Sequence, residues 1–144
     1  MREIKFRRWE RIPMLRMSFQ MNYNPTLEYG EAYINDAFIE SEHDLHKESI
    51  LMQYTGLNDS NGIEIYEGDI CKLSDEEPYS NEYISTDYDW EMIGKVVYRY
   101  GSYWVRMVED RHILIPLVSY FNSDMRLDII GNEFENPELL EVNP

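Results

Sequence analysis

The clearest structural signal in this chain is the stretch ILMQYTGLNDSNGIEIYEGDI, residues 50–70. An apolar start is followed by Gly56 and by five turn-forming residues at 58–62, and alternation of apolar and polar residues restarts at Ile63. Alternation with a period of two is typical of a half-buried strand, whereas Asn, Asp, Ser and Gly together are typical of a loop. The stretch therefore predicts a strand, a loop and a second strand, with a turn at 68–69 leading onward.

Short strands separated by turns continue toward the end of the chain. Residues 95–100 and 103–108 flank Gly101-Ser102, which predicts a hairpin with a two-residue turn. A short helix is predicted after Asn136 as its N-cap, with Pro137 at its first position. Further strands are predicted at 70–73, 113–117 and 126–130. This pattern predicts a mainly β fold, with a small barrel at about residues 50–144.

Strand alternation also opens the chain. In residues 3–9, Ile4 and Phe6 share one face, which is expected to be buried, and Lys5 and Arg7 share the other face. Similar alternation at 14–21 predicts a second strand that forms a hairpin with the first. Helix and strand both fit residues 22–49. Residues 1–49 are therefore predicted as a β hairpin or an α+β extension packed on the barrel.

Composition indicates a folded domain in a reducing compartment. Hydrophobic residues make up 43% of the 144 residues, which disfavours intrinsic disorder despite the charge. The longest apolar run, 113–118, is too short to span a membrane, and the charged start of the chain does not fit a signal peptide. The single cysteine, Cys71, cannot form an internal disulfide and is expected to be a buried apolar residue. We therefore expect a cytoplasmic protein with no membrane contact.

The charge of the chain disfavours nucleic acid as a ligand. The net charge is −15, and sequence-independent binding to nucleic acids depends on basic residues that meet phosphates. The distribution is uneven, because residues 1–16 contain six basic and two acidic residues. We predict that this basic strip pairs with acidic groups of the same chain or of a neighbouring subunit in a homo-oligomer. The candidates for self-association, on which nucleic-acid binding would also depend, are Arg7, Arg8, Trp9 and Arg11.

Three blocks of this sequence resemble the YopX-like family of bacteriophage and prophage proteins. They are MREIKFR with Trp9 at the start, residues 51–70 in the centre, and residues 130–132 with 135–140 near the end. The resemblance implies an SH3-like barrel from about residue 50, a phage or prophage origin and a location in the cytoplasm of the bacterial host. It implies no catalytic residues, because the family has no established activity.

The most distinctive segment is an acidic insertion at 74–93, which contains seven acidic residues and no Lys or Arg. The resemblance to SH3-like barrels places this insertion between the first two strands, beside the ligand surface. Loops on a rigid scaffold commonly carry function, and aromatic anchors among acidic residues suit a basic protein partner. We therefore expect a protein-docking role, against the alternative of a solvated segment that keeps the protein soluble. The candidate residues are Tyr79, Tyr83, Asp87, Tyr88, Asp89 and Trp90.

Signals for catalysis or metal binding are weak. His43 and His46 have the spacing of one helical face beside acidic residues, but no motif supplies a third ligand, so no metal or cofactor is predicted. The leading expectation is a non-enzymatic accessory protein that binds another protein. One alternative is an acidic mimic of nucleic acid that inhibits a host DNA-binding protein. Another is a metal-dependent hydrolase that uses Asp87 and Asp89.

Overall fold

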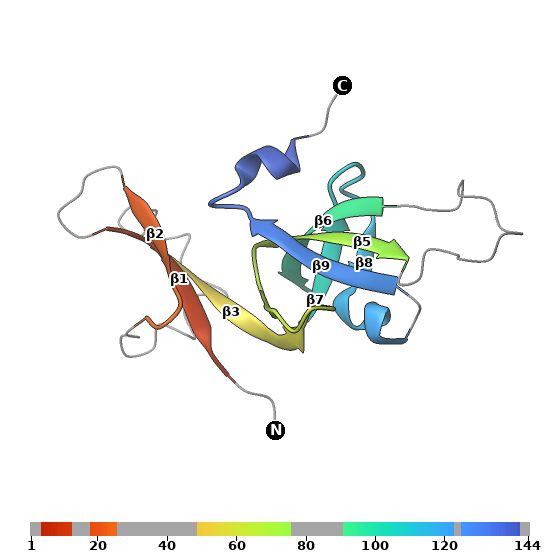
Figure 1. The fold of residues 1–144 in the computed structure, drawn as a ribbon, viewed down its shortest axis with the longest axis horizontal. Coiled ribbons are helices and arrows are strands. Elements are labelled where there is room, and N and C mark those ends of the chain that lie inside the picture. Colours follow the sequence, from red (N-terminus) through yellow and green to blue (C-terminus); the bar gives the residue numbers. More distant parts are fainter. Residues whose placement is uncertain (1–3, 13–17, 26–48, 76–90, 123–124, 142–144) are drawn as a thin grey trace, which may run out of the picture. The chain divides into compact units, whose positions relative to one another are not determined.

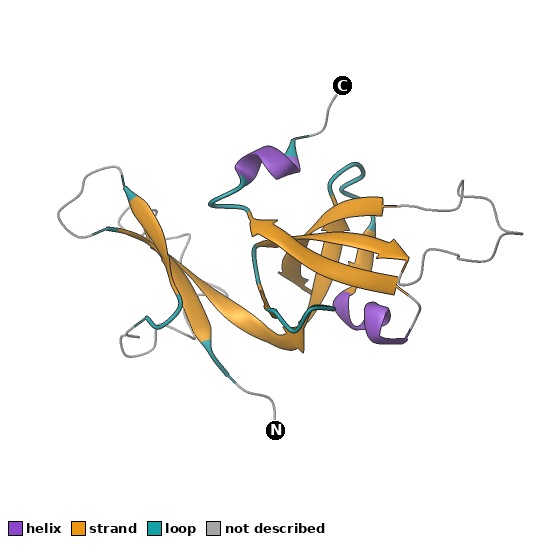
Figure 2. Cartoon of the chain, viewed as in Figure 1, coloured by secondary structure: helices purple, strands orange, loops and turns teal. Residues whose placement is uncertain are grey.

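The structure of the chain is a computed structural model, and it describes residues 4–12, 18–25, 49–75, 91–122 and 125–141. The chain divides into two compact units, Met1–Tyr54 and Thr55–Pro144. Strands predominate, and the helices within the described residues are two short 3-10 helices (Figure 2). The prediction of a mainly β fold is confirmed. In the described part of the chain, no helix is long and apolar enough to cross a membrane.

The first unit contains an antiparallel arrangement of three strands. Strand β1 (Phe6–Arg11) lies between β2 (Phe19–Asn22) and β3 (Ser49–Asn58). The predicted pairing of the two N-terminal strands is confirmed, with Arg11 opposite Phe19. The sheet order continues from β3 to β4 (Glu64–Tyr66). That residues 1–49 pack on the barrel stays a prediction.

The expected burial of Ile4 is wrong, whereas Phe6 is half-buried. The side chain of Ile4 is 70% exposed, whereas Arg7 on the opposite face is only 2% exposed. Arg7 lies opposite Met52, and its guanidinium lies 5.8 Å from the centre of the Tyr23 ring. A guanidinium can stack on an aromatic ring while its aliphatic stem lies among apolar groups. An aromatic ring from a neighbouring segment therefore helps to bury Arg7, the one buried residue of β1.

The second unit is built on an antiparallel sheet with the strand order β8-β7-β6-β5-β9. Strand β5 pairs with β6 on one side and with β9 on the other, and the sheet curls into a half-barrel (Figure 1). This half-barrel agrees with the small barrel that the sequence pattern predicts and with the SH3-like barrel that the family resemblance implies. The elements are β5 (Asp69–Asp75), β6 (Glu91–Arg99), β7 (Ser102–Met107), β8 (Leu114–Pro116), η3 (Leu117–Asn122), β9 (Met125–Asn132) and η4 (Pro137–Leu140).

The inner face of this sheet holds the core of the second unit. The strand register places Cys71 opposite Gly94 and Ile129, and Gly94 opposite Met107, so these residues share one face. Alternate residues of each strand therefore point into the half-barrel, and their burial is the main stabilising contribution. The core residues are Ile65, Cys71, Leu73, Val96, Tyr103, Val105, Met107, Leu117, Tyr120 and Leu127.

The predicted hairpin between β6 and β7 is present, but its turn is one residue earlier than predicted. Arg99 pairs with Ser102, so the two turn residues are Tyr100 and Gly101. Their φ angles are 53° and 75°. Two-residue hairpin turns of type I′ require a positive φ at both central positions, because their twist then matches that of the strands. This requirement decides the position of the turn, even though it puts a tyrosine in the left-handed region.

The helices also differ from the prediction in detail. The strand predicted at 113–117 ends at Pro116, because Leu117 begins η3 and enters the core together with Tyr120. Pro137 stands at the first position of η4, as predicted. Asn136 stands at the N-cap position, as predicted, but its side chain makes no cap hydrogen bond. Its Oδ1 atom instead accepts a hydrogen bond of 3.2 Å from the Asn132 N–H.

Close contact between β6 and β7 makes a testable prediction at Gly94. A Cβ atom added there would overlap Val105 Cγ1 and lie 3.0 Å from the Arg106 carbonyl oxygen. We expect Gly94→Ala to lower the free energy of unfolding by about 2–3 kcal/mol through overpacking, measured by urea denaturation. As a control, Gly101→Ala meets no neighbouring atom and is strained only by its φ of +75°. It should cost about 1 kcal/mol, and a larger loss at Gly101 than at Gly94 would contradict the steric account.

Candidate functional site

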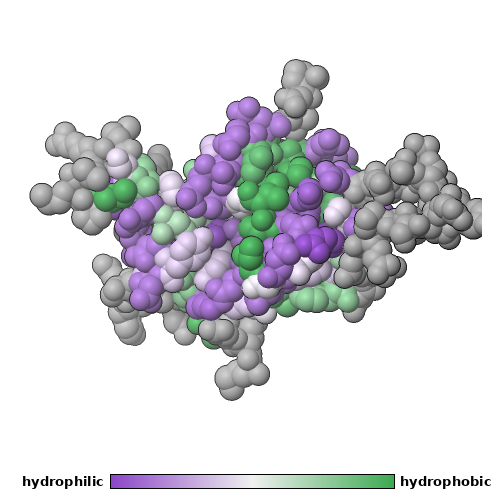
Figure 3. All heavy atoms as spheres, in the orientation of Figure 1, coloured by the Kyte–Doolittle hydropathy of each residue, from purple (hydrophilic) through white to green (hydrophobic). Residues whose placement is uncertain are grey.

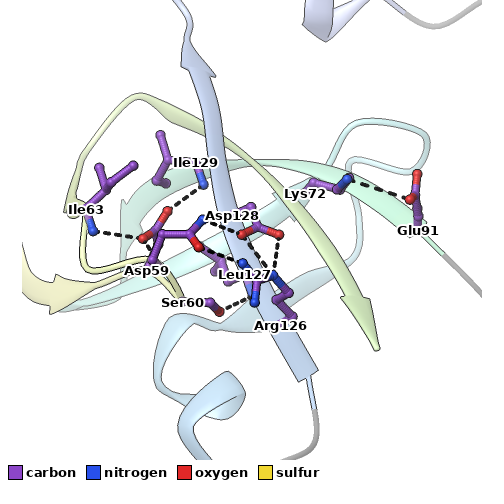
Figure 4. A network of polar contacts seen from close by, with 10 residues as sticks. Asp59, Ser60, Ile63, Lys72, Glu91, Arg126, Leu127, Asp128 and Ile129 are labelled. Carbon is purple, nitrogen blue, oxygen red and sulfur yellow. Dashed lines mark hydrogen bonds and ion pairs between the residues drawn. The ribbon is translucent and has the colours of Figure 1, made fainter. Parts of the chain in front are cut away.

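The loop between β3 and β4 is held by one buried carboxylate. The side chain of Asp59 is 6% exposed. Its Oδ1 atom accepts hydrogen bonds of 2.8 Å from the N–H groups of Asn61 and Ile63, and Oδ2 accepts one of 3.0 Å from the Ile129 N–H (Figure 4). A carboxylate that accepts several backbone N–H groups closes an Asx-type turn. Here the same carboxylate also joins the turn to β9.

Neighbouring residues of the loop extend this connection along β9. The Ser60 N–H donates to the Leu127 carbonyl at 2.9 Å, and the Leu127 N–H donates to Ser60 Oγ at 3.0 Å. Asn61 Nδ2 donates to Asp128 at 2.9 Å, and Arg126 lies between them, donating to Asn61 Oδ1 at 2.7 Å and to Asp128 Oδ2 at 3.0 Å (Figure 4). The bonds from Ser60 give partners to the backbone N–H and C=O groups of Leu127 on the outer edge of β9, which would otherwise be unpaired.

The C-terminal block has a similar architectural explanation. A Cβ atom on Gly131 would lie 2.5 Å from Asn136 Oδ1, so this position has no room for a side chain. The Asn132 side chain accepts hydrogen bonds from the Phe134 and Glu135 N–H groups at 3.0 and 2.9 Å. These bonds form the turn between β9 and η4. The same block therefore shapes the end of the chain and supplies no convergent reactive groups.

The Asp59 turn gives a prediction about stability. In Asp59→Asn, one oxygen can keep its turn bonds, but the new NH2 group then faces the N–H of Ile129. Because two donors are left facing each other in a buried site, we expect the free energy of unfolding to fall by about 2–3 kcal/mol. The measurement is thermal or urea denaturation of the purified variant.

Asp110→Asn is the matched control for Asp59→Asn. The Asp110 Oδ1 atom accepts one exposed hydrogen bond of 3.0 Å, from the His112 N–H, which an asparagine can also accept. The free energy of unfolding of Asp110→Asn should stay within about 0.5 kcal/mol of that of the parent chain. Equal losses in the two variants would contradict the role given to the bond with Ile129.

The single cysteine belongs to the core, as the sequence predicts. Cys71 is fully buried on β5 as a free thiol. Burial, with a smaller contribution from the negative charge of Asp69, raises the pKa of the thiol far above its ordinary value. Since the thiolate is the reactive form, this environment disfavours nucleophilic chemistry at Cys71.

The basic residues predicted for self-association make contacts within the first unit. The Trp9 ring stacks on Phe19, with ring centres 5.8 Å apart and planes 9° apart. The Arg11 guanidinium lies 6.0 Å from the centre of the Phe19 ring. Arg7 is buried against Tyr23, and Arg8 pairs with Leu51 and Asn22 in the sheet. The four residues are thus brought together on β1, and their role in self-association stays a prediction.

Self-association through β1 predicts a dependence on salt. If Arg and Lys side chains meet acidic groups of a second subunit, added salt should screen these pairs and shift the equilibrium toward monomer. Light scattering should then show a mass that falls as NaCl is raised. A monomeric mass at low salt and high protein concentration would contradict self-association through β1.

The candidate docking residues of the acidic insertion lie outside the described residues. This holds for Tyr79, Tyr83, Asp87, Tyr88, Asp89 and Trp90, and also for the possible metal ligands His43 and His46. What the structure does describe is where the segment begins and ends. Ser74 and Asp75 belong to β5, and Glu91 begins β6, so the connection between the two strands is residues 76–90. In the described part of the chain, no group of three or more His, Cys, Asp or Glu residues could hold a metal ion.

Sequence reasoning missed an exposed aromatic residue at the tip of the β6–β7 hairpin. The side chain of Tyr100 is 86% exposed, and its ring contacts Trp104 edge-on with ring centres 6.4 Å apart. On the face drawn in Figure 3, the described surface is mostly hydrophilic and its hydrophobic residues gather in a band. A tyrosine at a turn position that favours Asn or Gly is the signal that could have identified this site.

Comparisons with known proteins agree with this account of the fold. The family model described as YopX protein matches residues 5–141. The crystal structure of protein yopX from Bacillus subtilis is 18% identical, with a TM-score of 0.54, and the crystal structure of protein EF1440 from Enterococcus faecalis is 23% identical, with a TM-score of 0.51. Each match covers 98% of this chain and 100% of the other. A comparison with curated proteins finds no match.

Proposed function

Since the chain belongs to the YopX protein family, we propose that it is a phage- or prophage-encoded accessory protein that binds another protein in the bacterial cytoplasm. In this proposal the barrel is a scaffold and carries no catalysis. The connection 76–90 is the binding segment, and the partner is a protein with a basic face.

The observation that carries this proposal is the strand register at the base of the connection. Ser74 is paired with Glu91, so the connection leaves and rejoins the sheet at neighbouring positions. Lys72 Nζ lies 3.7 Å from Glu91 Oε1 beside this base (Figure 4). Strand β5 is held on its other side by β9. A segment with both ends fixed on a sheet can present side chains to a partner without taking part in the core.

The composition of the connection supplies the recognition chemistry. Residues 76–90 contain five acidic residues, three tyrosines and one tryptophan, and no Lys or Arg. Aromatic side chains provide large contact areas at interfaces, and complementary charge accelerates association with a basic partner. This combination favours a protein with exposed Lys and Arg as the partner.

The barrel itself uses its buried polar groups for architecture. The carboxylate of Asp59 holds the β3–β4 loop, and Asp69 Oδ2 accepts a hydrogen bond of 2.8 Å from the Tyr66 N–H. Arg126 and Asp128 form an ion pair of 3.0 Å with each other on β9. Groups engaged in this way favour a scaffold over a reaction centre, which supports the non-enzymatic form of the proposal.

The test replaces the connection with a tight turn. Because positions 74 and 91 are paired, exchanging residues 75–90 for Asn-Gly should join β5 and β6 by a two-residue hairpin turn in the same register and preserve the barrel. We expect an unchanged circular dichroism spectrum and cooperative unfolding, together with loss of the partner captured by the full chain. A variant that folds and still captures the same partner would refute the proposal.

Two charge variants sharpen this test. Glu82→Gln, Asp87→Asn and Asp89→Asn together should weaken capture at least tenfold, or about 1.4 kcal/mol. The matched control is Glu109→Gln, Glu138→Gln and Glu141→Gln, which removes the same charge from exposed positions elsewhere. Equal weakening by both sets would show that net charge, not the connection, governs binding. Competition by duplex DNA for a captured DNA-binding protein would identify the partner of a nucleic-acid mimic.

A further inference from the structure

The outer face of the β6–β7 hairpin combines aromatic and basic residues that are exposed or half-buried. Trp104 and Arg106 alternate with the buried Tyr103, Val105 and Met107 on β7, so both lie on the outer face of the sheet. Tyr100 stands at the turn and contacts the edge of Trp104. Arg99 is exposed beside it. We call Arg99, Tyr100, Trp104 and Arg106 the hairpin patch.

The backbone of the turn is strained in order to display Tyr100. It is the one residue other than glycine with a positive φ, 53°, in the described part of the chain. Aromatic residues are disfavoured there, and asparagine or aspartate would fit the turn better. Backbone strain of this kind concentrates at functional sites. Tyr100 thus stands at a position where local stability favours another residue.

The Trp104 ring is held in place by the backbone beneath the turn. Its Nε1 atom donates a hydrogen bond of 2.8 Å to the Arg99 carbonyl, and Arg99 Nη1 donates one of 2.8 Å to the Tyr98 carbonyl. These hydrogen bonds favour one orientation of the Trp104 ring and of the Arg99 guanidinium before any ligand binds. A preorganised surface loses little side-chain entropy on binding.

Positive charge on this face is incompletely compensated. Arg106 lies directly opposite Lys95, and like charges at such positions are destabilising. Lys95 has a partner, since its Nζ atom lies 3.7 Å from Glu133 Oε2. The Arg106 Nε atom is shielded from water and has no hydrogen-bond acceptor among the described residues. A buried donor without an acceptor is unfavourable, and an incoming anion that re-orients the guanidinium would relieve it.

We propose that the hairpin patch binds an acidic peptide segment of a partner protein, with Tyr100 and Trp104 as aromatic anchors and Arg99 and Arg106 as carboxylate-binding groups. Arg, Trp and Tyr are the residues most enriched among those that dominate binding energy at interfaces. Guanidinium groups bind carboxylates with two parallel hydrogen bonds. The patch contains no residue of the connection 76–90 and has the opposite charge, so it takes a different ligand.

Charge on the rest of the chain favours a peptide over a nucleic acid. The net charge of −15 repels any polyanion. Duplex DNA carries one charge per about 1.7 Å of its axis, and a long strand would extend beyond the patch onto acidic surface. A short peptide with a few carboxylates can bind locally at the two arginines. An acidic peptide is therefore the ligand that fits both the patch and the body around it.

The test measures binding of a short fluorescein-labelled peptide of alternating Glu and Tyr to the full chain by fluorescence anisotropy. The control peptide alternates Gln and Tyr and should bind at least about tenfold more weakly, because carboxylates are the groups recognised. Binding of the Glu peptide should weaken as NaCl is raised. Equal binding of the two peptides, or tighter binding of a labelled oligothymidine than of the Glu peptide, would overturn the proposal.

Variants locate the site. Arg99→Gln with Arg106→Gln should weaken binding at least about tenfold, whereas Arg111→Gln, an exposed arginine in the following turn, should leave it within about twofold. Tyr100→Asn should weaken binding while raising Tm, since asparagine suits the turn. That combination separates a binding role from a folding defect. Unchanged binding in Tyr100→Asn or in the double arginine variant would show that the patch is not the site.

Discussion

The carboxylate of Asp59 is the polar interaction that ties the β3–β4 loop of the barrel to its last strand. Its hydrogen bonds close the loop between β3 and β4 and also reach the backbone of β9, 70 positions further along the chain. Since β9 is the strand that pairs with β5 to complete the sheet, the loop can form its full set of bonds only after the last strand is in place. Local turn chemistry and closure of the half-barrel are therefore coupled through one side chain. Such long-range pairing favours slow, cooperative folding.

Features that depend only on residues near one another in the sequence could be predicted well. The strands of the second unit follow from a period of two, and the turns follow from their Gly, Asn and Asp residues. Features that depend on partners distant in sequence could not. The burial of Arg7 could not be predicted, because the ring of Tyr23, which lies beside its guanidinium, comes from another segment. The turn at Tyr100 was misplaced by one residue, because strand twist outweighed residue preference.

The same distinction applies to the candidate sites. An excess of acidic and aromatic residues marks the connection 76–90 directly in the sequence, and strand pairing at Ser74 and Glu91 fixes its base. The hairpin patch has no such signature, since its arginines are separated in sequence and share a face only through the alternation of β7 and the pairing with β6. An acidic composition also draws attention away from a small basic surface. Charge totals describe the whole chain, whereas recognition depends on which side chains share a face.

The position of Cys71 gives this chain a built-in reporter of its own opening. The thiol lies on β5, which is hydrogen-bonded on both sides, and it is completely enclosed by the core. Fraying of the edge strand β8 would not expose it, so an alkylating reagent could reach it only when the strands beside β5 separate from it. The rate at which the thiol is modified under native conditions would therefore report how often the half-barrel unfolds. No label has to be introduced to observe them, because this thiol is unique in the chain.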